Sequence, residues 1–222
     1  MAQIFHPSTN VLSKLSIVAV ALGVPALGTG AYLFSQTYGA EMYIPKPQPI
    51  PFSHRHHVGD DGIDCRFCHS SVDKGPFAGM PSTHTCMTCH SQIWSDSPEL
   101  EALRSSFRSG KPIQWARVHD LPDFVYFDHS IHVKKGVSCV SCHGRVDERP
   151  LAMKEQDLTM GWCIRCHRHP EKNIRPKEYV FNLAWKPNEE KGETQNELGE
   201  KLLETNKIMN ASQLTNCSIC HR

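Results

Sequence analysis

PFSHRHHVGDDGIDCRFCH, residues 51–69, is the stretch from which the organisation of the chain can be worked out. It holds four histidines and two cysteines, and its last five residues have the order C-x-x-C-H. Imidazole and thiol groups are the side chains that proteins most often use for binding metals, forming disulfides and attaching prosthetic groups. The pentad and the three histidines before it therefore need a common explanation.

The same pentad accounts for every cysteine of the chain. The 222 residues include ten cysteines and fourteen histidines, and all the cysteines fall in five C-x-x-C-H units. A disulfide framework does not place a histidine after every second cysteine, zinc ribbons pair C-x-x-C units without one, and a thioredoxin motif occurs once. C-x-x-C-H is instead the attachment signature of c-type haem, whose vinyl groups bond both thiols while the histidine becomes the proximal iron ligand.

We therefore predict five covalently attached haem c groups, at motifs numbered one to five along the chain. The attachment residues are Cys65 and Cys68, Cys86 and Cys89, Cys139 and Cys142, Cys163 and Cys166, and Cys217 and Cys220. The proximal ligands are His69, His90, His143, His167 and His221.

Length and composition limit the class of protein. The chain is long enough for one or two domains, and its net charge of +1 gives no bias toward nucleic acid. With so many haems per residue, the porphyrins must form much of the core. The expected fold is mostly irregular and α-helical, with little sheet and with short helices at the haem motifs.

An apolar segment precedes the motifs. LSIVAVALGVPALGTGAYLF, residues 15–34, has no charged residue and matches a helix that crosses a bilayer. A cleaved signal peptide is the alternative, with residues 29–31 as a small-residue cleavage site. We expect an anchor at 15–36, in the inner membrane, that the chain crosses once. Because c-type haems are attached outside the cytoplasm, residues 1–14 should be cytoplasmic and the haem domain, residues 52–222, periplasmic.

Three segments outside the motifs have recognisable compositions. IPKPQPIP, residues 44–51, has four prolines and predicts an extended, semi-rigid spacer. DSPELEALRSSFRSGKP, residues 96–112, has helix start and stop signals around one apolar face. Residues 171–216 are largely polar and charged and form either a solvated tail or, as we expect, an arm that orders against a partner.

An internal repeat explains the upstream histidines. FSHRHHVGDDGIDCRFCHSSVD, residues 52–73, and FDHSIHVKKGVSCVSCHGRVD, residues 127–147, share F-x-H-x-x-H-V, a short turn and then C-x-x-C-H. The second copy is one residue shorter before its cysteines, and a further motif follows each copy. The chain is thus predicted to consist of two di-haem modules, 52–118 and 119–170, and a C-terminal arm with the fifth haem, 171–222.

The repeat aligns His54 with His129 and His57 with His132, whereas His56 aligns with an isoleucine and is expected to bind no iron. F-x-H-x-x-H before a haem motif resembles the class III, cytochrome c3/c7-like families. The resemblance implies that His54 and His129 are the sixth ligands of the first and third haems. It also implies that His57 and His132 bind neighbouring haems. Two histidines on each iron leave no open position, which suits electron transfer.

The fifth distal ligand has several candidates. His119, in WARVHDLPDF, is our first choice because it enters the second module from outside the repeat. Met153 and Met160 are the alternatives, and a methionine ligand would raise the potential of that haem. His84 and His169 lie too close to their own motifs but could serve another haem.

WARVHDLPDFVYFDHSIHVKKGVSCVSCHG and MGWCIRCHR, together with the apolar N-terminal segment and the five motifs, resemble the pentahaem cytochrome c subunit of alternative complex III. The resemblance implies an electron-transfer subunit, without a catalytic site of its own, in a membrane quinol oxidoreductase. Its implied partners are an iron–sulfur, molybdopterin-enzyme-like subunit, polytopic quinol-binding subunits, and a monohaem cytochrome c or a terminal oxidase that takes the electrons. A self-contained, membrane-anchored quinol dehydrogenase is the alternative.

Overall fold

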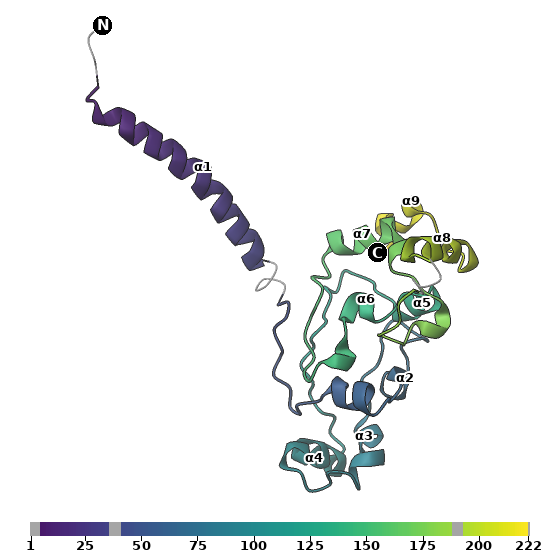
Figure 1. Cartoon of the computed structure of the whole chain (residues 1–222). Helices are drawn as coiled ribbons and strands as arrows, with labels where there is room; N and C mark the ends of the chain where they lie inside the picture. Colours follow the sequence, from purple (N-terminus) through teal and green to yellow (C-terminus); the bar gives the residue numbers. More distant parts are fainter. Residues whose placement is uncertain (1–4, 36–40, 188–192, 222) are drawn as a thin grey trace. The chain divides into compact units, whose positions relative to one another are not determined.

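The computed structural model describes residues 5–35, 41–187 and 193–221, in two compact units, Met1–Tyr43 and Ile44–Arg222. The described part of the first unit is dominated by the helix α1, Ser8–Phe34, which has no buried residue (Figure 1). Its length and apolar composition would let it cross a membrane. Pro25 lies inside the helix, as is tolerated in membrane helices. Residue 36, the end of the predicted anchor, lies outside the described residues.

The second unit is built from short helices and irregular connections, which confirms the predicted fold class. No sheet forms in the described ranges, where an isolated bridge joins Val137 and Ile174. Figure 1 shows short helices that are joined by long, extended connections. The helices that carry the haem motifs are α2 (Cys65–Cys68), α3 (Thr83–His90), α6 (Val140–His143), α7 (Met160–Arg168) and the 3-10 turn η8 (Cys217–Ile219).

A polar cap starts the helical turn at four of the five motifs. The side chains of Asp64, Ser82, Thr159 and Asn216 each accept a hydrogen bond from a backbone N–H two or three residues later. Such caps satisfy the free N–H groups of the first turn. Because residues three apart share a helix face, the turn brings both thiols of a motif to one side. The third motif has no side-chain cap; its helix α6 begins after Cys139.

The two repeat copies form helical turns of different kinds. The second copy forms the α-helix α5, His129–Lys134, and the first copy forms the π-helix η2, Arg55–Asp60. In η2 the N–H of Asp61 bonds the carbonyl of His56, five residues back, at 3.0 Å. The first copy has one residue more before its cysteines, and a π turn takes up such an extra residue. Equivalent histidines therefore keep equivalent positions.

The helix expected within residues 96–112 is present. It begins with the 3-10 turn η3, Pro98–Leu100, and continues as α4, Glu101–Ser109, ending at Gly110 with φ of 70°. Leu100 and Leu103 are buried against Ile50 of the proline-rich segment. The side-chain amide of Gln48 also bonds the backbone of Ala116: its nitrogen donates to the carbonyl and its oxygen accepts from the N–H. The proline-rich segment is thus packed into the second unit.

Beyond the fourth motif the chain folds back on itself. The turns η5 (Pro170–Lys172) and η6 (Lys177–Tyr179) follow α7, and η4 (Val146–Glu148) lies between the third and fourth motifs. The helices α8 (Gln195–Thr205) and α9 (Ala211–Leu214) both start with capping boxes. Gly199 of α8 lies against the backbone of Glu171 in η5. Residues 193–205 therefore order against their own chain; residues 188–192 of the expected arm lie outside the described residues.

Few apolar side chains are buried in the described part of this unit. They are Ile50, Val72, Leu100, Leu103, Ile174, Val180 and Leu183. A domain of this size normally buries well over half of its unfolded surface around one apolar core. Apolar groups other than side chains must therefore supply much of the core.

The contact between α8 and η5 gives a stability prediction. In Gly199→Ala the added methyl group would meet the backbone of Glu171, so α8 must shift away from η5. Overpacking of this kind costs roughly 1–3 kcal/mol. We expect a lower midpoint of thermal unfolding for the haem-loaded chain, followed by circular dichroism.

Glu200→Ala is the matched control, since Glu200 is exposed on the same helix. It should leave the midpoint within about a degree or two, as most exposed substitutions do. Equal midpoints for Gly199→Ala and the control would contradict the packing of α8 on η5.

Candidate haem-binding sites

Two pairs of histidines face each other with nearly parallel rings. The ring centres of His54 and His69 are 6.4 Å apart, with 10° between the ring planes. Those of His129 and His143 are 6.3 Å apart, with 8° between the planes. Each pair joins the first histidine of a repeat copy to the last residue of the motif that follows it. The two copies of the repeat thus place the same residues in the same arrangement.

The second histidine of each copy faces the next motif along the chain. The ring centres of His57 and His90 are 6.1 Å apart with 65° between the planes, and those of His132 and His167 are 6.2 Å apart with 33°. Helices η2 and α5 therefore each present one histidine to their own motif and one to its neighbour. The family resemblance implies that the second histidine of each copy binds a neighbouring haem, without saying which one, and this geometry is compatible with the next motif along the chain.

The separation within the pairs fits one metal ion between two rings. Two imidazoles bound to one metal from opposite sides, each with a metal–nitrogen distance of about 2.0–2.1 Å, have ring centres roughly 6.3 Å apart. The four observed separations lie between 6.1 and 6.4 Å. The residues present therefore fit haem irons with two axial histidines.

Hydrogen bonds fix the orientation of most of these rings. The Nδ1 atoms of seven predicted ligands lie 2.7–3.0 Å from backbone carbonyl oxygens. A carbonyl oxygen can only accept, so each Nδ1 carries the proton and the lone pair remains on Nε2, where a metal binds. The seven residues are His57, His69, His90, His129, His132, His167 and His221.

Burial keeps several ligands uncharged. Desolvation lowers the pKa of His54 to about 4 and that of His143 to about 3, with neighbouring histidines adding to both shifts. An imidazole with so low a pKa is neutral at pH 7 and can bind a metal. Desolvation also raises the pKa of Cys139 to about 11 and that of Cys142 to about 12. Such surroundings suit an uncharged sulfur, as in a thioether, better than a thiolate.

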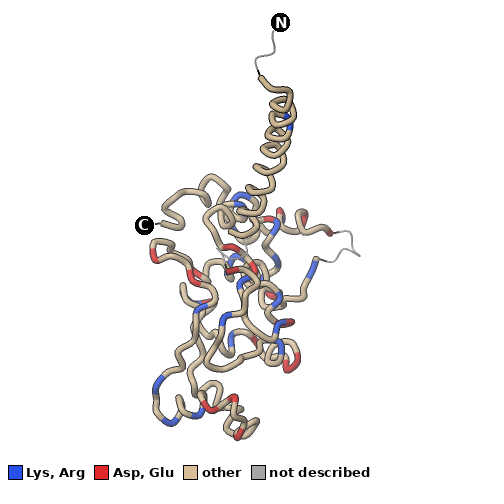
Figure 2. Tube along the Cα trace, turned by 90° about the vertical axis from the view of Figure 1, so that its left-hand side faces the viewer, with Lys and Arg blue, Asp and Glu red and all other residues tan. Residues whose placement is uncertain are grey.

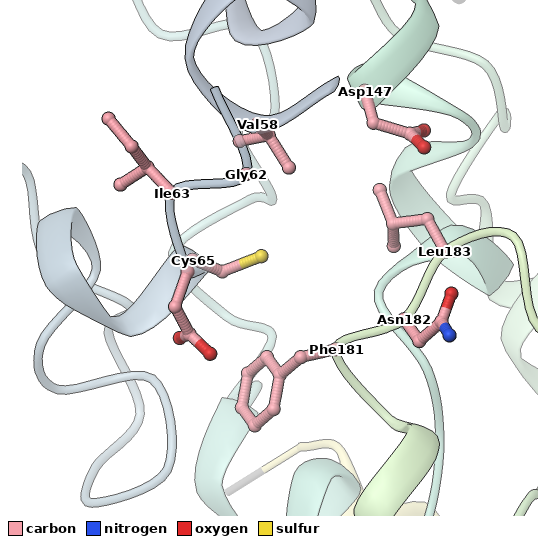
Figure 3. Close-up of a pocket in the computed structure, with 9 residues that line it drawn as sticks. Val58, Gly62, Ile63, Cys65, Asp147, Phe181, Asn182 and Leu183 are labelled. Carbon is pink, nitrogen blue, oxygen red and sulfur yellow. The ribbon is translucent and has the colours of Figure 1, made fainter. Parts of the chain in front are cut away.

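A cavity adjoins the first attachment cysteine. Figure 3 shows the thiol of Cys65 pointing into a space of about 250 Å³ between the first motif and the segment that follows η6. Val58 and Leu183 bring apolar side chains to this space, whereas Asp64, Asp147 and Asn182 make much of its lining polar. A group bonded to the Cys65 sulfur would therefore meet both kinds of side chain.

Comparisons with known proteins show which family the chain resembles. Residues 125–222 match the family described as cytochrome c7 and related cytochrome c. The multiheme cytochrome c subunit of menaquinone reductase from Nitratidesulfovibrio vulgaris Hildenborough is 35% identical over 147 residues, which cover 57% of this chain and 70% of that protein. The chain belongs to the multihaem cytochrome c family.

A second relative covers a smaller region. Cytochrome c-552 of Porphyromonas gingivalis W83 is 32% identical over 90 residues, which are 37% of this chain and 18% of that protein. Membership of the multihaem cytochrome c family implies covalently bound haem c, attached through C-x-x-C-H motifs.

The motifs of the cytochrome follow one another in space in the order two, one, three, four, five. Burial is the main cause that raises the pKa of the thiols of Cys86 and Cys139, and a nearby thiol of another motif, that of Cys68 and of Cys65 respectively, adds to the shift. Cys166 adds in the same way to the raised pKa of Cys142, and Cys220 to that of Cys163. Each of these pairs joins two motifs that are neighbours in space. Figure 1 shows the corresponding succession of α3, α2, α6 and α7, and α9, which precedes the fifth motif, contacts α7.

The fifth motif differs from the others. The ring of His221 faces Phe124, with ring centres 5.9 Å apart, and its Nδ1–H bonds the Phe124 carbonyl at 3.0 Å. No histidine forms a ring pair with His221 among the residues that the structure covers. This site is therefore assembled from the segment just before the second repeat copy and the C-terminal turn η8.

His119, our first choice for the fifth distal ligand, packs against a proximal histidine. Its ring centre is 4.2 Å from that of His143, with 74° between the planes, which is too close for a metal between the rings. Desolvation lowers the pKa of His119 to about 4, and its Nε2 is buried without a hydrogen-bond partner. The structure thus places His119 at the third motif, and its binding to the fifth haem remains a prediction.

The other candidates for this ligand are also placed. Met160 begins α7 and is 67% exposed, and Met153 is partly buried. His84 packs against Phe107, and His169 lies 3.3 Å from a carboxylate oxygen of Glu171. Neither of these two histidines forms a ring pair with a proximal histidine among the described residues.

The facing pairs predict a spectroscopic change on removal of one ring. His129→Ala should convert one haem from low spin to high spin, because the iron bound to His143 would lose its second ligand. The number of attached haems should not change, since both cysteines of the motif remain. Electron paramagnetic resonance of the oxidised protein, with a haem assay, measures both quantities.

His56→Ala is the control from the other repeat copy, because His56 faces no proximal histidine; it lies beside Trp94, Asp60 and Asp61. It should leave the spin state of every haem as it is in the unaltered protein. An unchanged spectrum in His129→Ala would remove His129 from the set of ligands.

Proposed function

We propose that this chain carries five haem c groups and transfers electrons as the periplasm-facing subunit of a membrane quinol:acceptor oxidoreductase of the alternative complex III type. The observation that carries the proposal is the series of four facing histidine pairs in a continuous succession of motifs. Bound haems would supply the one-electron chemistry, since an iron with two axial histidines leaves no position for a substrate.

The role of the chain is to hold these groups in place. We assign His54, His57, His129 and His132 as distal ligands of the first, second, third and fourth haems, opposite the proximal histidines that they face. The Nδ1 bonds to backbone carbonyls keep each Nε2 aimed at its metal. Burial excludes water from the buried ligands, which limits the reorganisation that accompanies each change of charge.

Membrane attachment is supported by two independent observations. Helix α1 is long and apolar enough to span a bilayer, and the relative from Nitratidesulfovibrio is a subunit of a menaquinone reductase. We propose that α1 anchors the cytochrome in the inner membrane by a single pass. Its partners would be an iron–sulfur, molybdopterin-enzyme-like subunit and polytopic quinol-binding subunits, with a monohaem cytochrome c or a terminal oxidase as the acceptor.

A second candidate is a self-contained quinol dehydrogenase that feeds a periplasmic reductase. It requires a haem with an open or weakly bound sixth position. The fifth motif favours it, because His221 faces Phe124 and no histidine ring pair forms there among the described residues. The two candidates differ in whether the chain alone oxidises quinol.

Quinol oxidation by the isolated chain decides between them. The full-length cytochrome, purified in detergent with its haems, should be fully reduced by dithionite but not by a menaquinol analogue. The complex purified from native membranes should oxidise the same quinol, because its other subunits bind it. Haem reduction followed at the visible absorption bands is the measurement.

Three results would have different meanings. Rapid reduction of the isolated chain by quinol would support the self-contained dehydrogenase. Co-purification of the chain without any quinol-binding subunit would argue against the complex. A chain that dithionite cannot reduce would contradict both functions.

A further inference from the structure

An exposed apolar pair directly follows the second haem motif. The side chains of Ile93 and Trp94 are 59% and 60% exposed. Trp94 also has φ of 55°, in the left-handed region that bulky residues rarely adopt. Backbone strain of this kind persists only where the surroundings impose it, and it gathers at functional sites. Packing within the chain therefore does not explain why the indole of Trp94 is held facing outward.

Trp94 is connected to both histidines of the second site. The carbonyl of Ile93 accepts a hydrogen bond from Nδ1 of His90, at 3.0 Å. The indole stacks on His56, with ring centres 6.0 Å apart, and the His56 ring in turn contacts His57 at 5.5 Å. His57 and His90 face each other across this site. Trp94 is linked to one of them through His56 and to the other through Ile93, so it lies beside the site. A protein that covered Trp94 would come close to the haem held there.

Carboxylates surround the indole. Asp96 and Glu99 border an open hollow of about 540 Å³ together with Trp94. Asp60 and Asp61 lie 3.8 Å and 3.7 Å from the ring nitrogens of His56, and their side chains are 58% and 50% exposed. Four exposed carboxylates thus ring a small apolar centre. We call these four residues, with Ile93 and Trp94, the Trp94 face.

The nearest arginines do little to offset this charge. Arg104 is 21% exposed, forms an ion pair with Glu101 at 2.7 Å and donates to the carbonyls of Ser95 and Ser97 from behind the loop. Arg55 is exposed on η2 and offsets at most one of the four carboxylates. Figure 2 shows acidic and basic positions next to each other at the lower end of the second unit, where Figure 1 places α4 and where Arg104 and Arg108 both pair with Glu101.

We propose that the Trp94 face docks a positively charged, one-electron carrier protein, which exchanges an electron with the haem at the second site. The proposal rests on the proposed function. Charge complementarity selects the partner, because opposite charges steer association and suppress partners of like charge. An apolar centre of only two side chains suits a small, short-lived interface and not a permanent subunit contact. One electron passes between haem and carrier, the one oxidised as the other is reduced, and no bond or proton moves.

The motif order makes this position useful. The second motif stands at one end of the succession two, one, three, four, five, and so has one neighbouring motif instead of two. A carrier at the Trp94 face would thus meet the end of the haem series. Electrons that enter at any other motif could reach it through the remaining haems.

Electron exchange with carriers of opposite charge tests the proposal. The reduced full-length cytochrome is mixed in a stopped-flow instrument with a basic monohaem cytochrome c or, separately, with an acidic one. The test variant is D60N/D61N/D96N/E99Q. Its second-order rate constant with the basic carrier should fall about tenfold or more at low ionic strength, since steering of this kind is worth about 10–1,000-fold. The difference should shrink in about 0.5 M salt.

E200Q/E204Q is the matched control, because Glu200 and Glu204 are exposed carboxylates on α8, remote from the second motif in the sequence. It should react like the unaltered protein. Trp94→Ala should lower the rate constant at every salt concentration, and Trp94→Phe should keep most of it. Haem content and visible spectra should be the same in all variants.

Cross-linking gives a readout that does not depend on electron transfer. A carbodiimide joins carboxylates to lysines in direct contact, so the unaltered cytochrome should link to the basic carrier through the four acids of the Trp94 face. Cross-links elsewhere, or equal rate constants for the fourfold variant and the control, would overturn the proposal. A chain that exchanges electrons with dithionite but with neither carrier would also overturn it, whereas failure with dithionite too would point to the proposed function itself.

Discussion

The spacing between facing imidazole rings is the constraint on which this fold depends. The rings of each pair lie about 6 Å apart, a separation that fits an iron between them and is too large for direct contact. The backbone carbonyls that accept from Nδ1 fix the rings, and the polar caps fix the turns that carry the thiols. With few buried apolar side chains, the second unit needs the prosthetic groups as its core.

The two repeat copies show how strongly this constraint acts on the backbone. The first copy has an extra residue between its histidines and its cysteines, and a π turn in η2 absorbs it, while α5 is an ordinary α-helix. The ring separations nevertheless agree, at 6.4 and 6.3 Å. The position of the ligands is thus maintained at the expense of regular helix geometry, as expected if an iron must lie between them.

Much of this could be predicted from the sequence because haem attachment has a local signature. The C-x-x-C-H motifs can be recognised in the sequence without any structure. Comparison of the two repeat copies singles out His54 and His57 as candidate ligands, because His56 aligns with an isoleucine. The π turn and the spatial order of the motifs depend on long-range packing, for which the sequence has no local signal. His119 illustrates the limit: nothing in the sequence indicates that its ring packs against His143, and its binding to the fifth haem stays a prediction. The face around Trp94 was also missed, because its residues come from two separate segments.

The most direct test of this account is near-infrared magnetic circular dichroism of the oxidised full-length cytochrome, which reports the axial ligands of each low-spin haem. The account predicts four haems with two histidine ligands, whatever the fifth haem shows. Histidine–methionine or high-spin signals from any of the haems at the first four motifs would contradict the assignment of the facing pairs as axial ligands.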